Sequence, residues 1–315
     1  MATEVGIETF PSDGPWDAPG GLPGWMGSMG ATIVKIRSDG FASQANRDKD
    51  CAQVRSIAAN GLRIVTRPGG LHDGDCGEGV PLWNGTDVST CCRRNIDRFY
   101  DVILNCVVNA GYGGWDRWYA HILANEPNKT ATYGSGSAVA TYKDHLKAVA
   151  RKIVQYGWTW IPFVTPPMCW TYGDPYNAQG FYSATVQAFS EEPAMAQAFK
   201  YFGFHIYWGD DGFRDSLMTS AQNYAAAAGK RLFVAESNVD PAQMNTCYDG
   251  THCLRHASHR HMFYTLRNNA AALIIFLLTG GQEGWSEYNL GDCSGCTNQV
   301  KDYTYQWVME PGRWA

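Results

Sequence analysis

The sequence predicts an α/β fold, a single-domain (β/α)8 or TIM barrel that spans residues 1–315. Short runs rich in β-branched and aromatic residues alternate with longer amphipathic runs, a pattern typical of repeated βα units around a parallel sheet. Eight short runs can be counted, and no Pro/Ser-rich linker or charged block divides the chain. Eight parallel strands close naturally into a barrel, and such barrels commonly form one domain at this length.

The expected strands are the short apolar runs. The first βα unit departs most from the pattern, because residues 11–30 are rich in Gly, Pro and Trp and only Gly24–Gly30 could form a short helix. We place the strands at Val5–Phe10, Thr32–Arg37, Leu62–Thr66, Tyr119–Ala124, Thr159–Val164, Gly203–Tyr207, Arg231–Ala235 and Ala272–Leu278.

The expected helices lie between these strands, and several have recognisable ends. Gly61, Gly157 and Gly229 fall where a residue in the left-handed conformation would end a helix, and Ser89 precedes a helical run as an N-cap. We place the helices at Gln44–Ala59, Thr90–Asn109, Ala138–Tyr156, Ser183–Phe202, Phe213–Gly229 and Cys253–Asn269.

Composition and charge are those of an ordinary soluble enzyme. The chain is 45% hydrophobic and 17% charged, and its formal net charge of -5 disfavours nucleic acid or an anionic membrane as a partner. The longest apolar stretch, Ala270–Leu278, is too short to cross a bilayer. We expect a monomer that binds neither nucleic acid nor membrane.

The ten cysteines favour disulfides and an extracellular, secreted protein, because the count is even and several spacings are short. The N-terminus lacks the basic and apolar regions of a signal peptide, which argues against secretion unless the Met1-Ala2 start replaces a removed leader. A rival interpretation is a structural zinc site with His252 nearby. The clustered cysteines are Cys76, Cys91 and Cys92, then Cys247 and Cys253, then Cys293 and Cys296, and the last four would hold the zinc.

Two glutamates stand at the ends of expected strands. Asn125-Glu126-Pro127 closes the apolar run 118–124, and Glu236 closes the run 231–235. Hydrolysis of a glycosidic bond needs two carboxyl groups, one that protonates the leaving oxygen and one that attacks the sugar or activates water. The carboxyl ends of barrel strands build the active site, so both glutamates are expected there. Taken alone, Asn-Glu-Pro is also a plausible turn.

The order of these motifs resembles the retaining glycoside hydrolases of clan A, which include cellulases, mannanases, xylanases and β-glycosidases. The resemblance implies that Glu126 is the acid/base and Glu236, in Val-Ala-Glu-Ser, the nucleophile, with no metal or cofactor. His205 and Tyr207 match the His-x-Tyr motif of strand six, and the tyrosine is expected to hydrogen-bond the nucleophile. Arg37 matches an arginine at the end of strand two that lies near the nucleophile.

Charge explains why these residue types belong together. An adjacent Arg37 and a hydrogen bond from Tyr207 would lower the pKa of Glu236 and keep it anionic. A like-charged neighbour and a partly apolar wall would raise the pKa of Glu126, so that it begins protonated. Asn125 could donate its amide to the sugar 2-hydroxyl. His205 could instead be a satisfied buried histidine, and Arg37 an internal ion-pair partner.

Sugar contacts are expected from aromatic and polar side chains in the loops after the strands. The resemblance places Trp285, after strand eight, under the sugar next to the scissile bond. Trp170 and Trp208 are further candidates, each with core packing as the alternative. Glu283 could bind a sugar hydroxyl or compete for a catalytic role, or could simply be solvated. The loop candidates of lower rank are Tyr172, Arg67 and His72.

Two functions from different classes remain open. The first is a retaining glycoside hydrolase that cleaves β-glycosidic bonds of a poly- or oligosaccharide, with an open cleft and endo action indicated by the many aromatic residues and the lack of large insertions. The second is a non-catalytic carbohydrate-binding barrel, such as a surface or viral component. The two converging carboxylates favour the enzyme, because a binding module has no physical need for them. A metal-dependent hydrolase is a third hypothesis.

Overall fold

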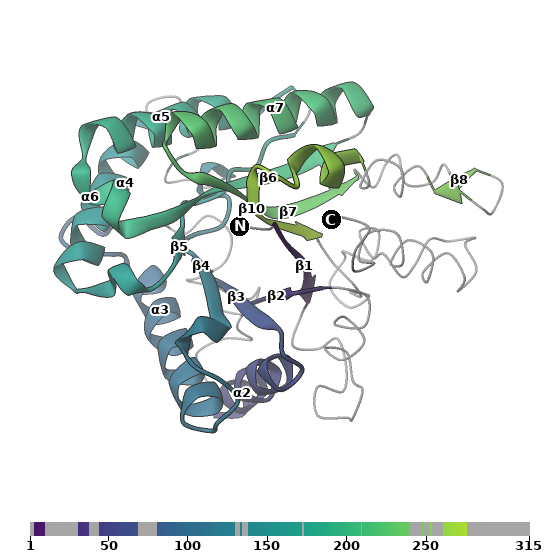
Figure 1. Cartoon of the computed structure of the whole chain (residues 1–315). Coiled ribbons are helices and arrows are strands. Elements are labelled where there is room, and N and C mark those ends of the chain that lie inside the picture. The colour runs from purple at the N-terminus through teal and green to yellow at the C-terminus, as the bar shows by residue number, and fades with distance from the viewer. Residues whose placement is uncertain are drawn as a thin grey trace.

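The computed structural model describes residues 3–9, 31–37, 44–68, 81–129, 133, 138–171, 173–208, 210–239, 247–248, 252–253 and 261–275. Eight parallel strands form a closed barrel in the order β1-β2-β3-β4-β5-β6-β7-β10 (Figure 1). The predicted (β/α)8 barrel is therefore confirmed. The strands are β1 Glu4–Thr9, β2 Ile33–Arg37, β3 Arg63–Arg67, β4 Trp118–Ile122, β5 Phe163–Val164, β6 Phe199–Trp208, β7 Arg231–Val239 and β10 Ala270–Ile275.

The helices lie outside the barrel, and each α-helix packs against neighbouring helices or strands (Figure 1). A two-stranded antiparallel hairpin, β8 Cys247–Tyr248 and β9 His252–Cys253, follows β7, and residues 261–266 are helical. The α-helices are α2 Gln44–Ala59, α3 Thr90–Ile103, α4 Ala138–Gln155, α5 Ala178–Glu191, α6 Pro193–Ala198 and α7 Asp211–Ala227. The short turns are the π-helix η1 Leu104–Val108 and the 3-10 helices η2 Trp115–Arg117, η3 Pro127–Lys129 and η4 Trp158–Trp160.

Most predicted helix ends are confirmed. Ser89 caps α3 by accepting a hydrogen bond from the amide of Cys92 at 3.3 Å. Gly61, Gly157 and Gly229 have φ angles of 78°, 69° and 63°, the left-handed region that glycine reaches without strain.

Two predicted helices are wrong in part. The expected helix Ser183–Phe202 stops at Glu191, and Pro193 starts the separate helix α6 because a proline without an N–H fits the first turn of a helix. Its last expected residues, from Phe199 on, belong to β6, where buried aromatic side chains pack better on a strand. The expected helix Cys253–Asn269 is also too long, since Cys253 lies in β9 and the described helical turn covers 261–266.

The hydrophobic core has two layers, because neighbouring residues of a strand point to opposite faces. On β2, Val34 and Ile36 belong to the layer between barrel and helices, whereas Ile33 belongs to the barrel interior. Lys35, between the first two, is completely buried. A buried lysine needs an anionic partner, so the interior of the barrel near the ends of the strands is the place to search for a site.

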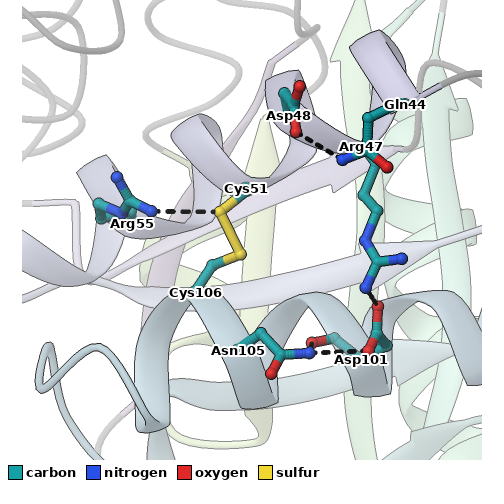
Figure 2. Close-up of a disulfide and its surroundings, with 8 residues drawn as sticks. All are labelled: Gln44, Arg47, Asp48, Cys51, Arg55, Asp101, Asn105 and Cys106. Carbon is teal, nitrogen blue, oxygen red and sulfur yellow. Dashed lines mark hydrogen bonds and ion pairs between the residues drawn. A yellow bond between two sulfur atoms is a disulfide. The ribbon is translucent and has the colours of Figure 1, made fainter.

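One disulfide joins Cys51 of α2 to Cys106 of η1, and Figure 2 shows it together with a nearby ion pair between Arg47 and Asp101. The prediction of disulfides is confirmed, although the sequence did not indicate this pairing. Cys91 is also disulfide-bonded. Within the described part of the chain, Cys92 and Cys169 are buried thiols outside any disulfide.

The zinc hypothesis stays untested. The backbone places Cys247 opposite Cys253 across the β8–β9 hairpin. Cys293 and Cys296, like Cys76, lie outside the described residues. Within the described ranges, no helix combines the length and the apolar character needed to cross a bilayer.

Candidate active site

The carboxyl ends of β4 and β7 bring Glu126 and Glu236 together at one end of the barrel. One carboxylate oxygen of each glutamate and one ring nitrogen of His205 all lie within 4.8 Å of one another. The three side chains are buried, the glutamates with a few per cent of their surface still exposed. The two glutamates expected to face each other thus do so, with His205 of β6 beside both.

Glu126 is held rigidly by its backbone and by the side chains of His205 and Lys129. Its φ of 45° is unusual for a residue other than glycine, and such strain concentrates at functional sites. Its amide donates to the carbonyl of Pro167 at 3.0 Å. Its Oε1 lies 3.0 Å from His205 Nδ1, and its Oε2 lies 2.8 Å from Lys129 Nζ. The carboxylate therefore has a fixed orientation.

Glu236 lies in a denser network. Lys35 Nζ lies 2.7 Å from its Oε1, and Tyr207 Oη donates a hydrogen bond of 2.7 Å to its Oε2. Arg67 Nη1 is 3.8 Å from Oε1, and His205 Nδ1 is 3.7 Å from Oε2. Both carboxylate oxygens of Glu236 therefore have polar partners, and the carboxylate cannot rotate without breaking at least one of these contacts.

A further carboxylate, that of Glu8 on β1, contacts the same two cations, Lys35 and Arg67, that lie near Glu236. Lys35 Nζ lies 2.9 Å from Glu8 Oε2 and also donates to the carbonyl of Ala235 at 3.0 Å, and Arg67 Nε lies 2.9 Å from Glu8 Oε1. Glu8 and Lys35 are direct neighbours in the register of β1 and β2. Two cations and two carboxylates alternate in the barrel interior, so their charges compensate one another.

The sequence prediction of a cation on β2 named Arg37, whereas the structure places Lys35 against Glu236. Arg37 ends β2, and its side chain lies outside the described residues. Arg67, considered as a ligand for sugar hydroxyls, instead joins Glu8 to Glu236. Glu8 and Lys35 were missed, although a charged residue in the middle of an apolar strand is a signal that could have found them.

The network keeps Glu236 ionised. Burial raises the pKa of this carboxyl, but the charges of His205, Lys35 and Arg67 outweigh burial and hold the pKa well below its usual range. Burial and the charge of Glu236 raise the pKa of Tyr207 well above its usual value, so the phenol remains protonated and donates to the carboxylate. A buried, anionic and fixed carboxylate is suited to nucleophilic attack.

The pKa of Glu126 differs from the expectation. Burial and the charge of Glu236 raise this pKa, as expected. The hydrogen bond and charge of His205 and the charge of Lys129 lower it by more, so the pKa of Glu126 lies below its usual value. The sequence argument lacked these two partners. Because Glu126 Oε1 and His205 Nδ1 are 3.0 Å apart, one proton can be shared between them.

Asn125 precedes Glu126 and is buried with both amide atoms lacking a partner among the described residues. A buried amide without a hydrogen bond is costly, and polar ligand groups commonly satisfy such atoms. A sugar hydroxyl beside Glu126 would do so.

The other expected sugar contacts divide into two groups. Trp208 and Trp170 pack in the hydrophobic core, which favours their packing alternative, and Trp170 contacts Phe204 with ring centroids 5.8 Å apart. The remaining candidates, Trp285, Glu283, Tyr172 and His72, lie outside the described residues.

The same three side chains, Glu126, His205 and Glu236, have donor atoms close enough to hold a metal ion. Lys35 and Arg67 already neutralise Glu236, however, so a divalent cation would meet two fixed positive charges within the same network. The charge distribution favours proton transfer and nucleophilic attack by the carboxylates over metal binding.

Comparisons with solved structures find the same fold in several enzymes. An endo-1,4-β-D-mannanase from Thermotoga petrophila superposes with a TM-score of 0.58 at 13% identity, over 96% of this chain and 99% of its own. An endoglucanase from Pseudomonas stutzeri gives a TM-score of 0.56 at 10% identity, over 97% of this chain and 94% of its own. The fold is shared with glycoside hydrolases. No family model matches the chain, and no curated protein sequence is similar to it.

Proposed function

We propose that this protein is a retaining glycoside hydrolase that cleaves β-glycosidic bonds of a poly- or oligosaccharide. The observation that carries the proposal is the separation of Glu126 and Glu236, whose nearest oxygens lie within 4.8 Å. Retaining pairs stand roughly 5 to 5.5 Å apart, whereas inverting pairs stand roughly 6.5 to 9.5 Å apart to admit a water molecule. The gap here accommodates a sugar carbon attacked directly by a carboxylate.

In the first step, a carboxylate oxygen of Glu236 attacks the anomeric carbon and forms a glycosyl ester. The bond between that carbon and the leaving oxygen breaks, and Glu126 gives its proton to this oxygen. Tyr207 and Lys35 keep the carboxylate of Glu236 anionic and aligned before the attack.

In the second step, Glu126 removes a proton from water, and the resulting hydroxide attacks the anomeric carbon and releases Glu236. His205 Nδ1, beside Glu126 and Glu236, can share the proton that Glu126 donates in the first step and regains from water in the second. The amide of Asn125 would bind the sugar 2-hydroxyl, an interaction that strengthens as positive charge develops on the ring.

Endo action and an extracellular location are further parts of the proposal. The matched structures include an endo-acting mannanase and an exo-acting β-1,3-glucanase from Aureobasidium namibiae, with a TM-score of 0.51 for the latter. We keep endo action, as the aromatic content and the lack of large insertions indicated. The disulfide Cys51–Cys106 supports an extracellular protein, because such bonds persist in oxidising compartments.

The test compares Glu236→Gln and Glu126→Gln with the wild-type chain on neutral β-glycans and aryl β-glycosides. Glu236→Gln should lose hydrolysis of all substrates, since the amide cannot form the ester. Glu126→Gln should retain more activity on aryl glycosides with a good leaving group, which need no proton, and azide should raise its turnover by forming a glycosyl azide. Unchanged turnover of Glu236→Gln would remove this residue as the nucleophile.

Proton NMR of the first products decides the stereochemistry, because a retaining enzyme releases the β-anomer before mutarotation. Initial release of the α-anomer would refute the double displacement. Chain length measured early in the reaction distinguishes endo action, which cuts long chains rapidly, from exo action, which releases short sugars.

A further inference from the structure

A cavity of about 690 Å³ opens at the end of the barrel opposite the glutamates. Its lining includes the first residues of several strands, Glu4 of β1, Arg63 of β3 and Arg231 of β7. Glu126 and Glu236 instead lie at the carboxyl ends of the strands. The cavity is therefore a separate place on the molecule, and the mechanism above makes no use of it.

One wall of the cavity is a cluster of aromatic rings. Trp115 of η2 and Trp160 of η4 line the cavity and meet edge to face with centroids 4.9 Å apart. Tyr100 of α3 does not line the cavity, but its ring stacks on Trp115 with centroids 5.2 Å apart. Trp160 keeps 45% of its surface exposed and Tyr100 keeps 40%. Clustered exposed rings of this size commonly mark a binding surface, because leaving them in water has a free-energy cost.

The inner end of the cavity is rigid. Tyr119 and Tyr201 stack with centroids 5.8 Å apart, and Tyr119 Oη donates to the carbonyl of Ala271 at 2.9 Å. The guanidinium of Arg63 lies 4.5 Å above the ring of Tyr119 and 2.5 Å from Glu4 Oε2. These contacts orient the aromatic faces before any ligand arrives, which lowers the entropy lost on binding.

The charges around the cavity are mixed. Arg63, Lys200 and Arg231 contribute positive charge, and Glu4 and Asp116 contribute negative charge. Lys200 and Asp116 are exposed. The two carboxylates would repel an anion, and the three basic groups would repel a cation. A purely apolar ligand would remove water from all five charged groups without replacing their hydrogen bonds. Hydroxyl groups can donate to the carboxylates and accept from the cations, so a neutral polyhydroxylated ligand fits both signs.

We propose that this cavity is a second glycan-binding site, in which a short stretch of a neutral polysaccharide lies against Trp160 and Trp115. The apolar face of a pyranose ring would cover the exposed indole ring of Trp160, and its hydroxyls would contact Lys200 and Asp116. The choice of a glycan as ligand rests on the proposed function. Binding here would hold a long substrate near the enzyme between cleavage events and raise its local concentration at the glutamates.

The test is affinity electrophoresis of the full chain in gels that contain galactomannan, arabinoxylan, hydroxyethylcellulose or a soluble β-1,3-glucan. Glu236→Gln serves as the parent so that the polymer is not degraded. We expect at least one polymer to retard the parent and Trp160→Ala to weaken the apparent affinity about tenfold, as for removal of a central aromatic contact. Tyr264→Ala is the matched control, because Tyr264 is 40% exposed and does not line the cavity.

Near-UV circular dichroism checks that Trp160→Ala is folded, and Lys200→Ala, a change at an exposed residue, gives an independent variant with the same expected weakening. Equal retardation of both cavity variants and the parent, or no retardation by any neutral polymer, would overturn the proposal. A parallel gel contains the anionic polymer polygalacturonate. Retardation in that gel alone, abolished by Lys200→Ala, would also overturn the proposal, since the ligand would then be an anion.

Hydrolysis of a short aryl glycoside separates this inference from the proposed function. Trp160→Ala in the otherwise unaltered chain should cleave it at the wild-type rate. If the chain hydrolyses the glycoside but retardation does not depend on Trp160, the proposed function stands and the second binding site is refuted. If retardation depends on Trp160 but the chain hydrolyses nothing, the second binding site stands and the proposed hydrolase function is refuted.

Discussion

Replacement of Lys35 by methionine removes the cation closest to the proposed nucleophile while keeping a side chain of similar volume. Lys35 Nζ lies 2.7 Å from Glu236 Oε1, against 3.8 Å for Arg67 Nη1. Coulomb's law at an effective dielectric constant of about 20 gives attractions of about 6 and 4 kcal/mol for these distances. Lys35 thus supplies more of the positive potential at Glu236 than Arg67 does, and its loss should raise the pKa of Glu236.

The same change should destabilise the fold by about 3–5 kcal/mol, because Glu8 and Glu236 would remain buried with Arg67 as their shared cation. Because the pKa of Glu236 is lower in the folded than in the unfolded chain, ionised Glu236 stabilises the native state above about pH 4.3, the pKa of an unperturbed glutamate. This contribution is lost as the pH falls through the folded pKa. In Lys35→Met this contribution should be smaller, and its loss, which begins near the unfolded pKa in both proteins, should be complete at a higher pH than in the wild-type chain.

Two assays measure these effects. The acidic limb of kcat/KM against pH reports the ionisation of the nucleophile and should move to higher pH in Lys35→Met. Urea unfolding at pH 7 reports stability, and the double variant Lys35→Met/Glu8→Gln should recover much of it, since one unpaired buried carboxylate is gone. An acidic limb that stays in place in a folded Lys35→Met protein would refute the assignment of Lys35 to the nucleophile.

The remaining predictions concern the acid/base, the sugar contact and the disulfide. Lys129→Met should raise the pKa of Glu126 by removing a charge that lowers it, so the basic limb of kcat/KM should move to higher pH; a shift to lower pH would contradict the assignment. Asn125→Ala should reduce kcat about 100-fold on natural glycans and much less on 2-deoxy aryl glycosides, and an equal loss on both would exclude the 2-hydroxyl contact. Replacing Cys51 and Cys106 by alanine should cost about 4 kcal/mol in urea unfolding, since their bond closes a loop with a sequence separation of 55, while leaving kcat unchanged; equal stability would show that the bond does not form.

Local patterns determined the barrel and its catalytic candidates. The alternation of strand-like and helix-like runs, and glycines such as Gly157 at helix ends, depend on interactions within a few residues, so they are visible in the chain. Glu126 and Glu236 end such runs, and the closure of parallel strands then brings strand ends together. The error at Phe199 has the opposite origin, because packing on the barrel overrode a helical pattern. The break at Pro193, in contrast, follows from a local signal, a proline that starts a new helix.

Tertiary structure decided which charges meet in the barrel interior. Lys35 contacts Glu236 across 201 positions of the chain, and strand register together with side-chain reach selects that partner, which no local pattern encodes. The downward pKa of Glu126 likewise depends on His205, 79 positions away. The sequence by itself determined the strands and the two glutamates, whereas the burial that makes each charge costly, and the partner that balances it, exist only once the barrel has closed.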